Sequence, residues 1–122
     1  MSNPFKSIPK SRVLYESDDF FLIKDAFPVS PGHMLIISKR EVSDFFDLTD
    51  SERNNLNKSI LIAKTFIEMD YLPDGYNIGM NCGAAAGQTV FHFHCHVIPR
   101  YIGDMKNPRG GVRHCVEGKG NY

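Results

Sequence analysis

The sequence lacks a long apolar run, an excess of charge of either sign and any Cys-x-x-Cys pair. A helix that spans a bilayer needs about 18 apolar residues in a row, so we expect no membrane partner. The 14 basic residues balance 14 acidic ones, whereas polynucleotide binders rely on a basic surface, so we expect no polynucleotide partner. Residues 1–11 have no apolar signal segment, and the three cysteines are odd in number. These features predict reduced thiols and a cytoplasmic location.

The composition is that of one globular domain. The chain has 122 residues, of which 42% are hydrophobic and 23% are charged, and a chain of this length can bury its own core. We predict a single domain over residues 1–122. Its core is expected at about residues 13–100, followed by a Gly-rich, basic surface tail at residues 101–122.

Strand signals outnumber helix signals. Aromatic and branched residues predict a hairpin over residues 13–16 and 20–24, and a buried strand over residues 33–37. Thr49 and Glu52 have the spacing of a capping box at the start of one long helix. Further strands are predicted at residues 76–81 and 90–98, the latter stopped by Pro99. This order predicts an α+β fold with a mostly antiparallel sheet.

Three histidines alternate along the last predicted strand, at His92, His94 and His96. Successive side chains of a strand point to opposite faces, so these three share one face. The residues that alternate with them are expected in the core: Phe91, Phe93, Cys95 and Val97. A lone histidine is most often structural, but three in alternation directly after a loop of small residues at 82–88 indicate a functional site.

A metal site is one interpretation of this cluster. His92 and His96 would lie roughly 13 Å apart along a strand, and metal–nitrogen bonds are about 2.0–2.1 Å, so the three rings do not easily share an ion. Two of them could, with a third ligand such as His33 or His114. No Cys pair or His-Glu-x-x-His helix supports such a site, and we predict no metal.

Nucleophilic catalysis is the other interpretation. Neutral imidazole is a good nucleophile near neutral pH, and attack on phosphorus would give a phosphohistidine that water then cleaves. This chemistry needs a partner that fixes the nucleophile's tautomer, and donors for the phosphoryl oxygens. Flanking imidazoles, the amides of residues 86–89 and the Thr89 hydroxyl could supply them.

Residues 87–100 resemble the motif of the histidine triad (HIT) family, His-φ-His-φ-His-φ-φ with φ apolar. Asp25, the segment 31–37 around His33, Asn81 and the long helix follow in that family's order, so the resemblance covers about residues 13–100. It implies the HIT-like α+β fold: about five antiparallel strands with one long helix and a short one, paired as a homodimer.

The resemblance also implies an enzyme that binds a purine nucleotide, cleaves at its α-phosphorus through a covalent nucleotidyl-histidine and releases a nucleoside monophosphate. His94 would be the nucleophile, and His96 would contact phosphate oxygens and assist the leaving group. His92 and His33 would form the supporting hydrogen-bond network. Further matching positions would bind the ribose (Asp25), the purine (Ile23 and Ala26) and the phosphate or leaving group (Asn81, Gly87, Gln88 and Thr89).

Two positions depart from the family's pattern. Many relatives carry a histidine where this chain has Glu41, a loss that should leave the triad unaffected. Many also bind zinc with a Cys-x-x-Cys near the N-terminus, where this chain has Asn3-Pro4-Phe5. We therefore expect no structural zinc and no required cofactor, although a divalent cation can accompany a polyphosphate substrate.

The substrate is left open between three alternatives. A dinucleoside polyphosphate such as diadenosine polyphosphate comes first, since Lys106, Arg109 and Arg113 could hold additional phosphates. A purine nucleoside phosphoramidase is second. A nucleotide-binding regulatory module without significant catalysis is third, and the intact triad with Asn81 and Thr89 argues against it.

Overall fold

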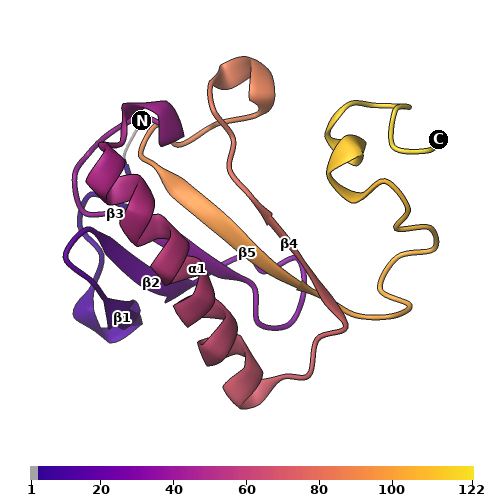
Figure 1. The fold of residues 1–122 in the computed structure, drawn as a ribbon, viewed down its shortest axis with the longest axis horizontal. Helices are drawn as coiled ribbons and strands as arrows, with labels where there is room; N and C mark the ends of the chain where they lie inside the picture. The colour runs from indigo at the N-terminus through magenta and orange to yellow at the C-terminus, as the bar shows by residue number, and fades with distance from the viewer. Residues whose placement is uncertain (1–2) are drawn as a thin grey trace.

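The computed structural model describes residues 3–122 and contains one antiparallel sheet with a long helix (Figure 1). The sheet has five strands in the order β1-β2-β3-β5-β4. The elements in chain order are β1 Val13–Glu16, β2 Phe20–Lys24, β3 Met34–Ser38, α1 Asp50–Asp70, β4 Gly75–Gly79 and β5 His94–Arg100. This arrangement confirms the predicted α+β fold, and the expected short helix is represented by brief 3₁₀ turns.

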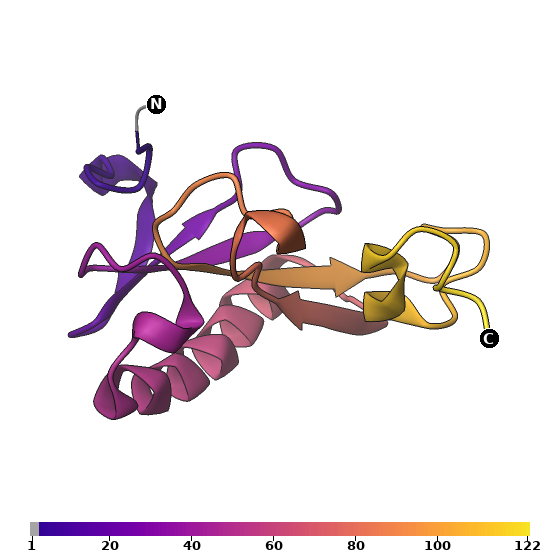
Figure 2. The same ribbon diagram turned by 90° about the horizontal axis from the view of Figure 1, so that it is seen from above.

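Helix α1 covers one face of the sheet (Figure 2). The helix begins as the capping box predicts: the Glu52 amide donates to Thr49 Oγ1 (3.1 Å), and the Thr49 amide donates to Glu52 Oε1 (2.8 Å). Its apolar side packs on alternate strand residues, which encloses the main core. That core includes Phe20, Leu22, Met34, Ile36, Leu56, Ala63, Ile67, Phe93, Cys95 and Val97.

A smaller apolar cluster lies on the opposite face. It consists of Ile23, Leu35 and Ile37, and Phe5, Ile8 and Val13 pack against it. Figure 2 shows the N-terminal segment on this side of the sheet, away from α1. Leu35 pairs with His96 and Ile37 with His94, and residues paired across antiparallel strands share a face. The histidines therefore continue this second layer.

Strand β5 differs from its prediction at both ends. It begins at His94 rather than at residue 90, and Phe91 is half-exposed instead of lying in the core. Pro99 was expected to stop the strand but lies within it, paired with Tyr76. The Pro99 carbonyl accepts from Ser30 Oγ (2.6 Å), beyond the last β3–β5 pair at Met34 and Val97. A residue's N–H and C=O face the same neighbour, so the missing N–H costs no ladder bond.

The tail, residues 101–122, contains a 3₁₀ turn, η4 (Gly111–Cys115). Figure 1 shows this segment beside the end of the sheet near β4. An added Cβ at Gly111 would meet the Asn77 side-chain nitrogen of β4 at 3.4 Å, so the tail contacts this edge strand. Within residues 3–122, none of the helices has the length and apolarity needed to cross a bilayer.

Candidate active site

Two of the triad histidines lie on β5, where the sheet brings them beside His33. The rings of His94 and His96 have centroids 5.4 Å apart, and those of His33 and His96 are 5.1 Å apart. His92 precedes the strand and is almost completely buried. His33, immediately before β3, is likewise buried, whereas His94 and His96 keep partial exposure. The accessible imidazoles are therefore the last two of the triad.

The His94 ring is oriented by a backbone carbonyl. Its Nδ1 lies 2.8 Å from the carbonyl oxygen of His92, and a carbonyl can only accept, so Nδ1 carries the proton. The neutral ring then keeps a lone pair on Nε2, which is the state that a nucleophile needs.

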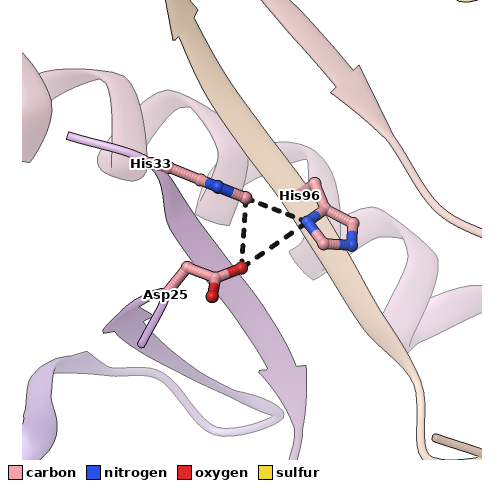
Figure 3. A group of neighbouring side chains, drawn as sticks. All are labelled: Asp25, His33 and His96. Carbon is pink, nitrogen blue, oxygen red and sulfur yellow. Dashed lines mark hydrogen bonds and ion pairs between the residues drawn. The ribbon is translucent and has the colours of Figure 1, made fainter. Parts of the chain in front are cut away.

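The His96 ring has the opposite tautomer. The Val29 amide donates to His33 Nδ1 (3.2 Å), which places the His33 proton on Nε2. That nitrogen lies 2.9 Å from His96 Nδ1, and the Asp25 carboxylate lies 3.3 Å from it (Figure 3). His96 Nδ1 therefore accepts, and its proton is on Nε2. The site thus presents one Nε2 lone pair and one Nε2–H donor on neighbouring rings.

Asp25, His33 and His96 are also the group that comes nearest to a metal site, with ligand atoms within 4.8 Å of one another. The hydrogen bonds oppose this use. His33 Nδ1 is occupied by the Val29 amide, so binding a metal through Nε2 would require either an imidazolate or the loss of that bond. The arrangement fits a hydrogen-bond relay better than a cation site.

Burial lowers the pKa of both histidines in this cluster. It lowers the pKa of His33 in spite of the nearby Asp25 carboxylate. Burial, together with the adjacent His94 and His33, lowers the pKa of His96 from 6.5 to about 4, again against the effect of Asp25. His96 is therefore a neutral hydrogen-bond donor at physiological pH.

Of the two sequence departures, Asn3 contacts both the other, Glu41, and the ring of His92. The Asn3 side-chain nitrogen lies 3.0 Å from Glu41 Oε2 and 2.9 Å from His92 Nδ1. His92 Nε2 lies 2.7 Å from the Ser38 carbonyl oxygen. His92 and His33 thus support different partners: His92 acts on His94 through its carbonyl, and His33 acts on His96.

The predicted phosphate loop is held by its own contacts. The amides of Ala86, Gly87 and Gln88 donate within the loop at 3.0–3.1 Å, so in this conformation they do not supply the predicted donors. Gln88 is buried: its Oε1 accepts from the Gly83 amide (2.8 Å) and its Nε2 donates to the Ser43 carbonyl (2.6 Å). Gln88 shapes the loop, and Thr89 is exposed at its end.

A cavity of about 850 Å³ is lined by His33 and His96 but not by His94. Its volume is within the range of about 300–1,000 Å³ that is usual for ligand sites. Its walls include His33, His96, Asn81 and Gly87, and Val112 of the tail. The remaining predicted nucleotide contacts lie outside it. Ala26 is exposed, Ile23 is fully buried beneath the N-terminal segment, and Asp25 faces His33 while its Oδ1 accepts from the Phe27 amide (2.8 Å).

The basic tail residues do not line this cavity. The Arg109 and Arg113 guanidinium carbons lie 4.9 and 4.7 Å from the centroid of the Tyr122 ring. Lys106 is exposed. His114, the alternative metal ligand, bonds to the Arg109 carbonyl (2.9 Å). In this conformation the tail gives the cavity apolar side chains rather than cations.

Four residues that orient the histidines were not predicted from the sequence: Val29, Ser38, Asn3 and Phe5. They act through a backbone amide, a backbone carbonyl, a side-chain amide and a ring packed 4.9 Å from that of His94. None belongs to a recognisable motif. Ser38, Asn3 and Phe5 lie far along the chain from the rings that they contact. Val29 is four positions from His33 but acts through its backbone amide, which no side-chain pattern reveals.

The chain matches known proteins over most of its length. The HIT domain family matches residues 7–103. An uncharacterized HIT-like protein of Mycoplasma genitalium is 39% identical over 89 residues, which are 70% of this chain and 61% of that protein. An AP-4-A phosphorylase of Mycobacterium tuberculosis is 33% identical over 109 residues (84% and 56%). A bis(5'-adenosyl)-triphosphatase of Saccharomyces cerevisiae is 34% identical over 105 residues (82% and 51%).

Solved structures agree with these matches. A zinc-bound histidine triad family protein from Mycobacterium smegmatis superposes with a TM-score of 0.69 at 38% identity, over 78% of this chain and 69% of that one. The chain spans about half to three-fifths of the length of the curated relatives, from 51% to 61%.

Proposed function

The chain belongs to the HIT family, and from this premise we propose that it is a nucleotide hydrolase that cleaves dinucleoside polyphosphates at the α-phosphorus. The observation that carries the proposal is the pair of complementary tautomers. His94 offers a lone pair on Nε2, and the adjacent His96 offers an N–H. Two of the relatives are named for diadenosine polyphosphates, which supports this substrate class.

The reaction has two displacements. His94 Nε2 forms a bond to the α-phosphorus as the bond from phosphorus to the leaving oxygen breaks, which gives a nucleotidyl-histidine. Water then forms the new oxygen–phosphorus bond while the nitrogen–phosphorus bond breaks. The nitrogen pair returns to Nε2, and the proton from water leaves with the monophosphate or to solvent. His96 Nε2–H stabilises charge on the phosphoryl oxygens throughout.

The state of His96 bears on the choice of leaving group. A neutral ring that gave up its Nε2 proton would become an imidazolate, so His96 acts as a hydrogen-bond donor rather than as an acid. A polyphosphate leaves as an anion and needs no proton, whereas the amine of a phosphoramidate must be protonated. This difference favours the polyphosphate. The phosphoramidase alternative draws support from Arg109 and Arg113, which lie against Tyr122 and away from the cavity.

The test is product analysis with His94→Asn beside the unaltered protein and His114→Asn as a matched control in the tail. We expect AMP from diadenosine polyphosphates, loss of turnover in His94→Asn with AMP binding retained, and normal turnover in His114→Asn. AMP from an adenosine phosphoramidate alone would assign the second alternative. Tight AMP binding without turnover of either substrate would assign the regulatory module instead.

The remaining expectations are part of the same proposal. We infer a homodimer, a purine nucleotide substrate, a cytoplasmic location and no required cofactor or metal. Gel filtration and metal analysis of the purified chain test the first and last of these directly.

A further inference from the structure

The N-terminal segment contacts the triad through the side-chain amide of Asn3, whose nitrogen and oxygen both make hydrogen bonds. Asn3 Nδ2 donates to Glu41 Oε2 (3.0 Å) and to His92 Nδ1 (2.9 Å), while Asn3 Oδ1 accepts from the Phe5 amide (2.9 Å). Lys6 Nζ lies 3.9 Å from the other oxygen of Glu41. A carboxylate can only accept and a backbone amide can only donate, so these partners fix which end of the Asn3 amide faces His92.

This amide is two hydrogen bonds from the nucleophile. Because Asn3 donates to His92 Nδ1, the His92 proton lies on Nε2, which donates a hydrogen bond to the Ser38 carbonyl oxygen (2.7 Å). The buried ring is thereby fixed at both nitrogens, and the carbonyl of the same residue holds His94 Nδ1–H (2.8 Å). Asn3 also accepts from the backbone amide of Phe5. The centroid of the Phe5 ring lies 4.9 Å from that of the His94 ring.

These residues do not form the zinc site that many relatives have. Zinc is bound by thiolate, imidazole or carboxylate groups. Here the lone pair of His92 Nδ1 is taken by an N–H of Asn3, and a lysine stands beside the one carboxylate, Glu41. The donor set therefore does not fit zinc. Hydrogen bonds from Asn3 instead join the N-terminal segment to Glu41, which follows β3, and to His92, which precedes β5.

Resting on the proposed function, we propose that Asn3, Glu41 and His92 form a metal-free clamp that positions His94 for attack. Asn3 is a positioning residue, since it acts through His92 and touches neither substrate nor phosphorus. Its amide selects the His92 tautomer, and the anchored His92 holds the carbonyl that selects the His94 tautomer. Glu41 holds the second N–H of Asn3 and so prevents the amide from turning away.

The first experiment measures where the His92 ring carries its proton, in the absence of substrate. ¹⁵N NMR of the histidine rings is expected to place the His92 proton on Nε2 in the unaltered protein and in Lys6→Ala, the control within the same segment. In Asn3→Asp the N–H donor becomes a carboxylate, so both His92 ring nitrogens face acceptors, and Nδ1 is expected to gain a proton in addition to the one on Nε2. Unchanged His92 signals in both Asn3→Asp and Asn3→Ala would overturn the proposal.

The second experiment measures the covalent step. In a single turnover, Asn3→Ala is expected to form nucleotidyl-His94 about tenfold or more slowly, with a smaller change in AMP affinity, while Lys6→Ala is unchanged. Loss of stability with a normal rate in the folded fraction would make Asn3 merely structural and contradict the clamp. If the unaltered protein has no turnover, the proposed function fails, but the NMR result still decides the clamp.

A rescue experiment replaces the hydrogen bonds of the clamp with an engineered zinc site. Asn3→Cys, Lys6→Cys and Glu41→His together would offer a Cys₂His₂ zinc set with His92. Zinc would then occupy the His92 lone pair that Asn3 occupies now. We expect one bound zinc per chain and recovery of the covalent rate relative to Asn3→Ala. Zinc binding without that recovery would show that anchoring His92 does not position His94.

Discussion

Each of the four histidines at the site has a ring nitrogen whose role is set by a neighbouring group. His33 and His92 each accept on Nδ1 from an amide, that of Val29 and that of Asn3 respectively, and His96 accepts on Nδ1 from His33. Only the His94 Nδ1 faces a carbonyl among these four. His94, the proposed nucleophile, is therefore distinguished from its neighbours by where its proton lies.

This assignment predicts an NMR pattern in the protein without substrate. At pH 7.5 we expect His94 alone of the four to carry its proton on Nδ1, while His33, His92 and His96 carry theirs on Nε2. Long-range ¹H–¹⁵N correlation of the ring nitrogens distinguishes the two forms. A His94 proton on Nε2 would remove the lone pair that the mechanism requires.

Gly32 fixes the approach to His33. Its φ of +92° belongs to the region that favours glycine, and an added Cβ would come within 2.9 Å of the Tyr71 ring at the end of α1. Gly32→Ala is therefore expected to lower the free energy of unfolding by about 1–3 kcal/mol, as measured by urea titration. Gly103→Ala has a similar φ, +89°, and open space around it. It should cost less, and equal losses would mean that the Tyr71 contact does not matter.

Residue patterns predicted His94 and His96 but not the contacts that give them opposite roles. Alternation needs only the period of a strand, which is local. His33 meets His96 across 63 positions of the chain, and Asn3 meets His92 across 89. Such pairs are brought together by strand order and loop closure, and no short-range pattern contains them.

At the scale of elements, helix α1 is tied to the end of β3 by one buried carboxylate. Arg40 donates to both oxygens of Glu52 at 2.8 and 3.0 Å, and Glu52 also caps the helix. The Arg40 hydrogen bonds, together with those to Thr49, lower the Glu52 pKa from 4.5 to about 2 against the effect of burial. A lowered carboxyl pKa contributes stability above the unfolded value, and the contribution is lost as the pH falls through the folded value.

Glu52→Gln is therefore expected to lower the free energy of unfolding at pH 7 by about 1.5–3 kcal/mol, since it weakens hydrogen bonds to a charged group. The difference from the unaltered protein should shrink as the pH falls from 4.5 to about 2, where Glu52 itself becomes protonated. Urea unfolding across this range measures it, with Glu117→Gln in the exposed tail as the control. A difference that stayed constant with pH would contradict the role of the Arg40 pair.

The elements themselves were largely predictable, because their signals are local. The capping-box spacing of Thr49 and Glu52 predicted the start of the helix, and the hairpin β1–β2 has the predicted bounds. The error at Pro99 has a topological cause. Whether a strand tolerates proline depends on which neighbouring strand its N–H would face, and β3 does not extend as far as Pro99. Strand order decides this, and the order follows from contacts between distant segments.

For the whole molecule, the buried histidines make stability depend on pH. In the folded protein the His96 pKa falls from 6.5 to about 4, mainly through burial, and that of His33 is also lowered. Between these values the unfolded chain binds more protons than the folded chain. The free energy of unfolding therefore decreases as the pH falls from 6.5 towards 4.

We expect this decrease in urea titrations between pH 7 and pH 4, and a shallower one in His96→Asn. His114→Asn, which alters a histidine of the tail, should keep the original slope. If His96→Asn and the unaltered protein had the same slope, partial burial would not hold the His96 ring neutral in the folded state.

The strand order has a consequence for synthesis on the ribosome. β5 is the last strand along the chain, yet it lies between β3 and β4. Until residues 94–100 have emerged, a nascent chain has two strand edges without their shared partner, and its core lacks Phe93, Cys95 and Val97. Closure of the sheet must wait for long-range pairing late in translation. The same insertion brings His94 and His96 to the site, so a chain halted earlier has neither a closed core nor the proposed nucleophile.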